Sequence, residues 1–430
     1  MRILMFTNTY APLVGGVSNS VQRFVQAYRQ AGHQVLVVAP RFGASPHREP
    51  GTIRVPAIQH FNGSDFALAV PIPGLLRHDI ERFEPDVIHS HHPFLLGETA
   101  LRFAETWKLP IVFTHHTLYE QYTHYVPGDS PRMKRFAIQL ATGYARLCDA
   151  VIAPSQSIAD LLLARGVDTP LEVIPTGVDF EYWRSGDPTA ARRALGIDEQ
   201  CFLVGHVGRL APEKNLGFLA NAVGGFLVAH PQAHFVVTGD GPARAEMQAI
   251  LAARGVSERA HFTGPLAGQA LIDLYHALDV FAFASHTETQ GMVLTEAMAA
   301  GVPVVAVDAP GAREVVHDRE DGRLIPRDDL AEFAAGLAWV AELSEAQREQ
   351  VCASALETAR SFCIERCAGR ALELYQRLIA EASPPAARDT SGWNVVRRRL
   401  EAEWKLLVNV GRAARSALQG SSIAPDETGT

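Results

Sequence analysis

Two glutamates stand in the most informative stretch of the sequence. Glu288 precedes a predicted helix, and Glu296 lies about two turns later, within it. Between them Gly291, Met292 and Val293 form the start of the helix, where free backbone N–H groups can bind an anion. Carboxylates on either side of such a site can accept hydrogen bonds from sugar and ribose hydroxyls. The stretch therefore suits a sugar nucleotide, although a loop glutamate and one on a solvated helix face are the alternative.

Arg209 and Lys214 form a second charged group, on one loop between a predicted strand and helix. A departing diphosphate gains negative charge during glycosidic cleavage, and cations beside a helix N-terminus can stabilise it. The chain has no DxD motif to hold a metal. We therefore expect the two cations to work without one, and the alternative is a loop of solvated charges.

Two glycine-containing loops follow other predicted strands. Gly15 and Gly16 precede the first helix, where they would let the backbone approach a ligand or simply make a tight turn. Gly239-Asp240-Gly241-Pro242 half-resembles a dinucleotide-binding fingerprint, but Arg244 stands where its third glycine would be.

Five histidines gather at two predicted strand ends. His89, His91 and His92 follow one strand, and His115 and His116 follow the next. No cysteine or carboxylate spacing accompanies them, so we predict no metal site. A structural role at the strand ends is the alternative to a role in binding.

Short apolar runs alternate with helix-length segments along the chain, and this pattern restarts at Phe202–Val207. It predicts an α/β protein with two doubly wound, Rossmann-like parallel sheets facing a cleft, with ligands at the carboxyl ends of the strands. Residues 344–380 have helical periodicity. The predicted parts are an acceptor-binding domain at 1–185, a nucleotide-sugar-binding domain at 186–360, a helix at 361–382 that crosses back to the first domain, and a tail at 383–430.

Composition excludes several classes of protein. The chain has 430 residues, of which 47% are apolar, too many for a disordered protein. Apolar runs such as Val302–Val307 are too short to span a bilayer, and the first residues lack the features of a secretory signal. Five cysteines without a CxxC pair fit a reduced, cytoplasmic chain. A net charge of −8 argues against nucleic acid as a partner.

The stretch from Ser285 to Val305 resembles the E-x7-E signature of retaining glycosyltransferases of the GT-B fold, in particular glycosyltransferase family 4. The loop with Arg209 and Lys214 matches the same family's G-R-(x)n-E-K-G/N pattern, with Asn215 where many members have glycine. The resemblance implies a hexosyltransferase that uses a nucleotide-sugar co-substrate and requires no metal or other cofactor. The motifs run in the family's order over residues 1 to about 380.

The resemblance also implies roles for individual residues. Arg209 and Lys214 bind the donor diphosphate, Glu288 contacts the donor sugar and Glu296 the ribose. His116, in a Thr-x-His-Thr context, lines the cleft beside the transferred sugar. The catalytic set is His116, Glu288, Arg209 and Lys214. The further donor-binding residues are Gly15, Gly16, Gly264, Leu266, Gly291, Met292, Val293 and Glu296.

The segment His115–Tyr125 resembles the branch of the family that glycosylates diacylglycerol. This implies a membrane lipid acceptor such as diacylglycerol, UDP-glucose as donor, and a peripheral location at the inner face of the cell membrane. Downstream, residues 131–147 form a predicted amphipathic helix with cations at its start, which would suit anionic headgroups or be an ordinary surface helix. The predicted acceptor and membrane residues are Tyr119, Tyr122, Arg132, Lys134 and Arg135.

The tail is a further candidate for membrane contact. Residues 390–419 carry six basic and two acidic side chains, a net charge of +4, together with Trp393, Trp404 and several aliphatic residues. Such a segment can lie in the interface of a bilayer, or be a solvated or packed helix.

Several alternatives stay open. The donor could be GDP-mannose, and the acceptor a phosphatidylinositol, another lipid-linked molecule or a polysaccharide. A nucleotide-sugar epimerase of the same fold and a two-lobed sugar-binding protein are remoter alternatives. Oligomeric state has no sequence signal.

Overall fold

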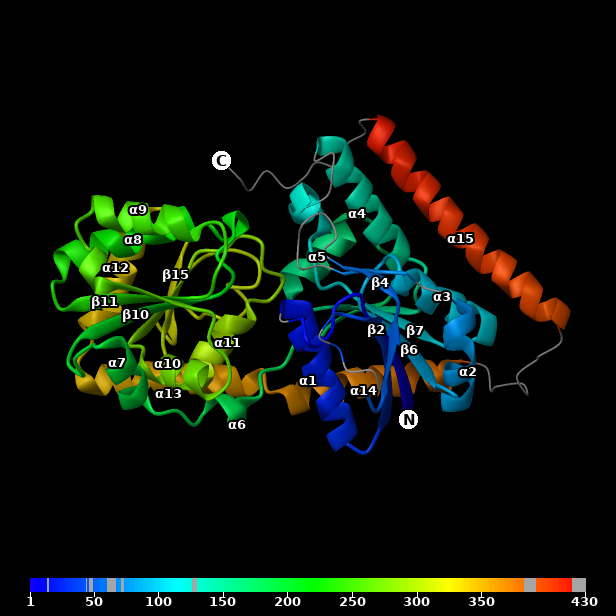
Figure 1. The fold of residues 1–430 in the computed structure, drawn as a ribbon, viewed down its shortest axis with the longest axis horizontal. Helices are drawn as coiled ribbons and strands as arrows, with labels where there is room; N and C mark the ends of the chain where they lie inside the picture. The colour runs from blue at the N-terminus through cyan, green and yellow to red at the C-terminus, as the bar shows by residue number, and fades with distance from the viewer. Residues whose placement is uncertain are drawn as a thin grey trace. The chain divides into compact units, whose positions relative to one another are not determined.

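A computed structural model describes residues 1–13, 15–43, 45, 49–59, 67–70, 73–125, 130–382 and 392–419. The chain divides into two compact units (Figure 1). The first comprises Met1–Thr176 and the residues from Cys367 onward, and the second comprises Gly177–Arg366. Each unit has its own parallel sheet and its own apolar core. The domain limits drawn from the sequence stay predictions.

The first unit is built on a seven-stranded parallel sheet in the order β3-β2-β1-β6-β7-β8-β9. Its central strands are short and apolar, and Ala150–Ala153 is buried at every residue, as expected where helices cover both faces. The chain leaves β1 towards β2 on one side and later returns to β6 on the other, so the strand order reverses at β1. The strands are β1 Arg2–Phe6, β2 Gln34–Pro40, β3 Thr52–Val55, β6 Val87–Ser90, β7 Ile111–Thr114, β8 Ala150–Ala153 and β9 Leu171–Val173, with an antiparallel pair β4 Ala57–Ile58 and β5 Leu68–Ala69.

The helices of the first unit start where the sequence provides caps. Ser130 accepts the Met133 N–H at the start of α4, and Ser155 accepts the Ile158 N–H at the start of α5. The helices are α1 Gly16–Gln30, α2 Pro73–Phe83, α3 Leu96–Trp107, η2 Tyr119–Tyr125, α4 Pro131–Ala145, α5 Gln156–Ala164, α14 Ile364–Glu381 and α15 Gly392–Gln419. The last of these confirms the predicted helical tail.

The second unit holds a six-stranded parallel sheet in the order β12-β11-β10-β13-β14-β15. Here too the first strand, β10, pairs with β11 on one side and β13 on the other. The strands are β10 Phe202–Val207, β11 Ala233–Thr238, β12 Ala260–Gly264, β13 Val280–Phe283, β14 Val304–Val307 and β15 Gly322–Ile325. The helices are α6 Phe180–Trp183, α7 Pro188–Leu195, η3 Pro212–Lys214, α8 Leu216–Ala229, α9 Arg244–Ala253, η4 Ser257–Arg259, α10 Gln269–Ala277, α11 Met292–Ala299, α12 Leu330–Ala341 and α13 Glu345–Ser361. The predicted pair of doubly wound sheets is confirmed.

The stretch with helical periodicity over residues 344–380 comprises two helices in the structure, α13, which ends at Ser361, and α14, which begins at Ile364. The backbone between them pairs with Val178. The Val178 N–H donates to the Phe362 carbonyl at 2.8 Å, and the Ile364 N–H donates to the Val178 carbonyl at 2.9 Å. The pairing residue lies far away in the sequence, so periodicity does not show which contact separates the two helices.

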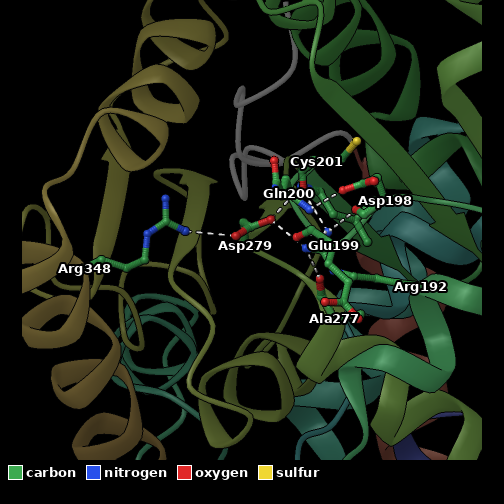
Figure 2. Close-up of polar contacts among 9 residues, drawn as sticks. Arg192, Asp198, Glu199, Gln200, Cys201, Ala277, Asp279 and Arg348 are labelled. Carbon is green, nitrogen blue, oxygen red and sulfur yellow. Dashed lines mark hydrogen bonds and ion pairs between the residues drawn. The ribbon is translucent and has the colours of Figure 1, made fainter.

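A partly buried ionic network fixes the amino ends of β10 and β13 (Figure 2). Asp279, which directly precedes β13, accepts hydrogen bonds from Arg192 and Arg348, both at 2.9 Å, and from the Leu203 N–H at 2.8 Å. The Arg192 guanidinium also donates to the carbonyls of Asp198, Glu199, Cys201 and Ala277. The network joins α7, α13 and both strands, so it holds the two strands whose other ends carry the charged loops.

Among the described residues, no helix has both the length and the apolar character needed to cross a bilayer.

Candidate active site

The charged residues of the second unit lie on the loops that follow β10 and β13. These are neighbouring parallel strands, and the chain connections diverge between them. The crevice outside the carboxyl ends of strands at such a reversal is where ligands bind in open α/β sheets. The fold therefore brings the Arg209–Lys214 loop and the Glu288 loop to the same edge of the sheet.

Lys214 and Glu288 meet at this edge. The Lys214 ammonium donates to a Glu288 carboxylate oxygen, and the two side chains keep 15% and 22% of their surface exposed. Lys214 ends the short helix η3, and Glu288 lies between β13 and α11. An ion pair that still reaches solvent can open to receive a charged ligand at less cost than a fully buried one.

Arg209 extends from the same loop towards solvent. Its guanidinium donates to Glu213, whose side chain is buried, while the Arg209 side chain is about half exposed. Asn215, just after Lys214, has the left-handed backbone conformation with φ of 54°. Glycine and asparagine adopt this conformation most readily. The geometry therefore accounts for asparagine at a position where the pattern also allows glycine.

The Gly239–Gly241 loop packs directly on the Arg209 loop. A Cβ added to Gly239 would lie 1.9 Å from the Gly208 carbonyl oxygen, and one added to Gly241 would lie 2.3 Å from the Leu210 carbonyl oxygen. The Gly239 N–H also donates to the Gly264 carbonyl at 3.0 Å. These glycines permit close backbone packing between three loops, so the half-match to a dinucleotide fingerprint has a structural explanation.

The remaining donor-side residues surround α11. Gly291 caps this helix in a left-handed conformation, and Met292 and Val293 are partly buried in its first turn. Glu296 is buried and accepts a hydrogen bond from the Tyr275 hydroxyl at 3.3 Å. Leu266 packs against the apolar core beyond Gly264.

The first unit places its histidines at the carboxyl ends of β6 and β7, beside the end of β1. The His91 N–H donates to the Phe6 carbonyl at 2.9 Å, and the Asn8 N–H donates to Nδ1 of His92 at 3.1 Å. Burial lowers the pKa values of His89 and His92 to about 3. Near neutral pH these rings are therefore uncharged.

His91 and His116 form a pair within this cluster. Nδ1 of His91 lies 2.9 Å from Nε2 of His116, and the rings stack with centroids 5.2 Å apart. Burial lowers the pKa of His116 to about 3 and that of His91 well below its usual value. Since both rings are neutral, one nitrogen of the pair donates and the other accepts. The tautomer of His116 is therefore coupled to that of His91.

The predicted acceptor residues lie on two elements of the first unit, η2 and α4, which pack against each other. The Tyr119 hydroxyl is buried, and burial raises its pKa. Tyr122 lies on the same short helix and is partly buried. Arg132 is exposed at the start of α4, Lys134 is half-buried, and Arg135 donates to the Ala417 carbonyl of α15 at 3.3 Å.

Gly15 and Gly16 are exposed at the start of α1, in the first unit. His116 belongs to that unit too, whereas the other predicted catalytic residues belong to the second. No group of three or more His, Cys, Asp or Glu side chains with metal-binding geometry occurs among the described residues.

Comparisons with known proteins agree with this arrangement. The family profile of Glycosyltransferase Family 4 matches residues 14–182, and that of Glycosyl transferases group 1 matches residues 187–355. Alpha-monoglucosyldiacylglycerol synthase of Acholeplasma laidlawii is 30% identical, over 71% of this chain and 80% of its own length. The chain belongs to glycosyltransferase family 4. A GDP-mannose-dependent alpha-mannosyltransferase of Mycobacterium tuberculosis is 31% identical over 76% of this chain and 84% of its own length.

Solved structures agree on the fold. Sucrose-phosphate synthase from Thermosynechococcus elongatus superposes with a TM-score of 0.72 at 20% identity, covering 88% of this chain and 99% of that one. The protein is thus a family 4 glycosyltransferase of the GT-B fold, and as an enzyme it is a hexosyltransferase. The predicted roles of its individual site residues stay predictions.

One residue of this family 4 enzyme that sequence reasoning missed is His206, near the end of β10. Its ring is buried, Nδ1 lies 3.1 Å from the Ala282 carbonyl, and Nε2 has no partner among the described residues. Burial lowers its pKa to about 4, and the Lys214 charge contributes in the same direction. A histidine within the apolar run Phe202–Val207 was the available signal.

Sequence reasoning also missed the hydrogen bonds that hold His89 in the histidine cluster. The Tyr375 hydroxyl lies 2.7 Å from Nδ1 of His89 and 3.0 Å from the Tyr28 hydroxyl. Nε2 of His89 in turn lies 2.7 Å from the Thr114 hydroxyl. Tyr375 comes from α14, so its contact with the cluster depends on tertiary structure that no local pattern encodes.

Proposed function

We propose that this enzyme transfers glucose from UDP-glucose to diacylglycerol in the membrane and retains the α configuration at the anomeric carbon. The observation that carries the transfer chemistry is the partly exposed Lys214–Glu288 ion pair at the carboxyl ends of β10 and β13. The choice of sugar and acceptor is supported by the Acholeplasma relative, whose name describes a monoglucosyldiacylglycerol synthase, and by the sequence of the His115–Tyr125 segment.

In this proposal the donor diphosphate separates the ion pair. Lys214 and Arg209 then face the phosphate oxygens, and Glu288 accepts hydrogen bonds from the sugar hydroxyls. Glu296, which already accepts a hydroxyl hydrogen bond from Tyr275, binds the ribose hydroxyls. Gly264 and Leu266 contact the base through backbone groups, and the N-terminus of α11 at Gly291–Val293 contributes its dipole.

The bond between the anomeric carbon and the phosphate oxygen breaks, and its electron pair stays on the diphosphate. The acceptor hydroxyl attacks from the same face, which retains the α configuration. The departing phosphate takes the hydroxyl proton, so the protein needs to provide no general base. Stabilisation of the developing charge by preorganised cations is the main contribution of the protein. No metal is required in this scheme.

His116 would orient the sugar as a neutral hydrogen-bonding group. Its pKa of about 3 means that it carries no charge near neutral pH. A neutral imidazole can bind hydroxyl groups without attracting the diphosphate. Its tautomer is coupled to that of its partner His91.

The reaction would take place at the inner face of the cell membrane. All five cysteines are free thiols, which suits a reducing compartment. Tyr119 and Tyr122 would face the acceptor, and the exposed Arg132 of α4 would face the anionic lipids.

The test is an assay of the purified enzyme with diacylglycerol in anionic vesicles, offered UDP-glucose or GDP-mannose in parallel. We expect a glucolipid from UDP-glucose, identified by mass spectrometry, with an α anomer by proton NMR. A mannolipid formed only from GDP-mannose would instead support the second candidate, a mannosyltransferase, which the mycobacterial relative favours. Absence of any lipid product with both donors would refute the lipid acceptor.

A further inference from the structure

Helix α15 is fixed to the first unit by one of its faces. Its buried residues, Ala402, Leu406, Asn409 and Ala413, recur every three or four positions and so share one side of the helix. This side packs on α3 and α4 (Figure 1).

Polar contacts fix the position of the helix. The Asn409 amide donates to the Leu140 carbonyl at 3.1 Å, and its oxygen lies where a Cβ on Gly143 would be. Arg102 pairs with Glu403 at 2.6 Å, and Lys405 pairs with Glu105. The helix is therefore held in one orientation, and its opposite side has a defined direction.

That opposite side is apolar and uncovered in the described structure. Leu400, Trp404, Leu407 and Leu418 are 65%, 69%, 65% and 73% exposed, and Val396 is 46% exposed. The spacing places all five on the side of the helix away from α3 and α4. We call these five residues the outer stripe.

Exposed apolar residues are concentrated on this helix. Of the twelve large hydrophobic side chains that are exposed in the described residues, six belong to α15, and the other six lie one each on or beside β4, β5, α5, α6, α8 and α12. Single exposed apolar residues are normal, but a contiguous row marks an interaction surface.

The surroundings of the outer stripe are cationic. Residues 392–419 carry six basic and two acidic side chains, a net of +4, in a protein with a net charge of −8. A groove of about 300 Å³ between α4 and α15 has Trp404, Leu147 and Val408 among its lining residues. Arg146, Lys405 and Arg412 line it. Arg412 has no ion pair among the described residues, so its charge is available to an anion.

We propose that α15 is a bilayer-docking element: its outer stripe enters the interface of an anionic membrane, and the adjoining cationic groove binds a phospholipid headgroup. An apolar row flanked by cations is the pattern of helices that lie in the plane of a bilayer. A second copy of this chain fits less well, because two helices of net charge +4 repel each other. The proposal locates the membrane contact that the proposed function requires, but docking itself needs no donor and no catalysis.

The experiment measures flotation of the full-length enzyme with vesicles, without donor. Binding to phosphatidylcholine vesicles containing phosphatidylglycerol is compared with binding to pure phosphatidylcholine vesicles. The stripe variant carries Leu400→Gln, Trp404→Gln and Leu407→Gln. We expect it to lose more than about tenfold in vesicle partitioning, because three apolar side chains no longer leave water.

A matched control carries Leu163→Gln, Val228→Gln and Leu330→Gln, which are 55%, 57% and 42% exposed on other helices. It should bind as the wild type does. Arg412→Gln alone should lower binding about fivefold on anionic vesicles and leave binding to neutral vesicles unchanged. Thermal melting of all variants should match the wild type, since the changes lie on an exposed surface.

Unchanged binding by the stripe variant would overturn the proposal. So would a dimer that becomes a monomer in the stripe variant while vesicle binding persists, which would make the stripe a contact between copies. Vesicle binding that depends on the stripe, in an enzyme that gives no glucolipid, would refute the proposed substrate and leave the docking role standing.

Discussion

The loops after β1, β6 and β7 in the first unit and those after β10 and β13 in the second occupy equivalent places on doubly wound sheets. In the second unit these loops carry charged side chains, and Lys214 and Glu288 form a partly exposed ion pair there. In the first unit they carry histidines that burial keeps neutral, with a pKa of about 3 at His116. The same topology therefore provides one charged site and one neutral site. A diphosphate needs the former, while a sugar or an uncharged lipid headgroup can be bound by the latter.

The strongest test of this contrast removes the cation of the charged site. Lys214→Gln removes the positive charge, shortens the side chain by one atom and leaves Glu288 facing the diphosphate without its partner. We expect a loss of roughly 10³-fold in kcat/KM, as for the removal of a preorganised charge-stabilising group. The measurement is steady-state transfer with UDP-glucose.

A matched variant, Lys108→Gln, changes a lysine that is exposed on the first unit. It should keep the activity of the wild type. If Lys214→Gln kept it too, the diphosphate role of the charged site would be wrong.

The next largest effect is expected at the amino ends of β10 and β13, where the Asp279 network holds the strands that carry the charged site. Asp279→Ala leaves the buried Arg192 without its carboxylate (Figure 2). We expect a loss of about 3 kcal/mol in the free energy of unfolding. Urea denaturation monitored by circular dichroism measures it.

Arg348 is the more exposed partner of Asp279, at 33% of its side-chain surface. Arg348→Ala should lower the free energy of unfolding much less than Asp279→Ala does, since Arg192 keeps its ion pair with Asp279. Equal costs for the two variants would show that the network does not act through burial of Arg192.

The neutral site predicts a pH dependence of stability. Burial lowers the pKa values of His89, His92, His115 and His116 to about 3 from 6.5. Below pH 6.5 the unfolded chain therefore binds more protons than the folded one. Stability falls as the pH drops from 6.5 towards 3, by about 1.4 kcal/mol per pH unit for each histidine.

His92→Asn should reduce this slope, because asparagine can still accept the Asn8 N–H but does not titrate. Urea midpoints at several pH values measure the slope. His78→Asn, at an exposed position of α2, should leave it unchanged. If the wild type, His92→Asn and His78→Asn had the same slope, burial would not lower the pKa of His92.

The sequence was sufficient for the alternation of strands and helices and for the contrast between a charged and a histidine-rich region. Both come from local signals: apolar runs of four to six residues, and motifs confined to one loop. The ion pair of Lys214 and Glu288 could be expected only as two residues near one ligand, because their contact joins loops that lie 74 residues apart.

Long-range packing was not accessible from the sequence. The burial of the Tyr119 hydroxyl, the pairing of Val178 with the backbone between α13 and α14, and the choice of which face of α15 is covered depend on neighbouring segments that are distant in sequence. The predicted basic amphipathic helix illustrates this point. Its residue Arg135 donates to the carbonyl of Ala417, so α15 covers part of a surface that looked free in the sequence.

The smallest effect is expected when the histidine cluster loses its hydrogen bond with the Tyr375 hydroxyl. Tyr375→Phe removes the hydroxyl that lies 2.7 Å from Nδ1 of His89 and 3.0 Å from the Tyr28 hydroxyl. The buried nitrogen of His89 then loses its partner, and we expect a cost of about 1–2 kcal/mol in the free energy of unfolding. Tyr28→Phe should cost less, because Tyr375 keeps its bond to His89. If sugar binding by the histidine cluster depends on the Tyr375 hydroxyl, Tyr375→Phe should also raise KM for the donor and leave kcat nearly unchanged. Lys214→Gln, in contrast, should lower kcat. The same kinetic change in both variants would break the distinction between the two sites.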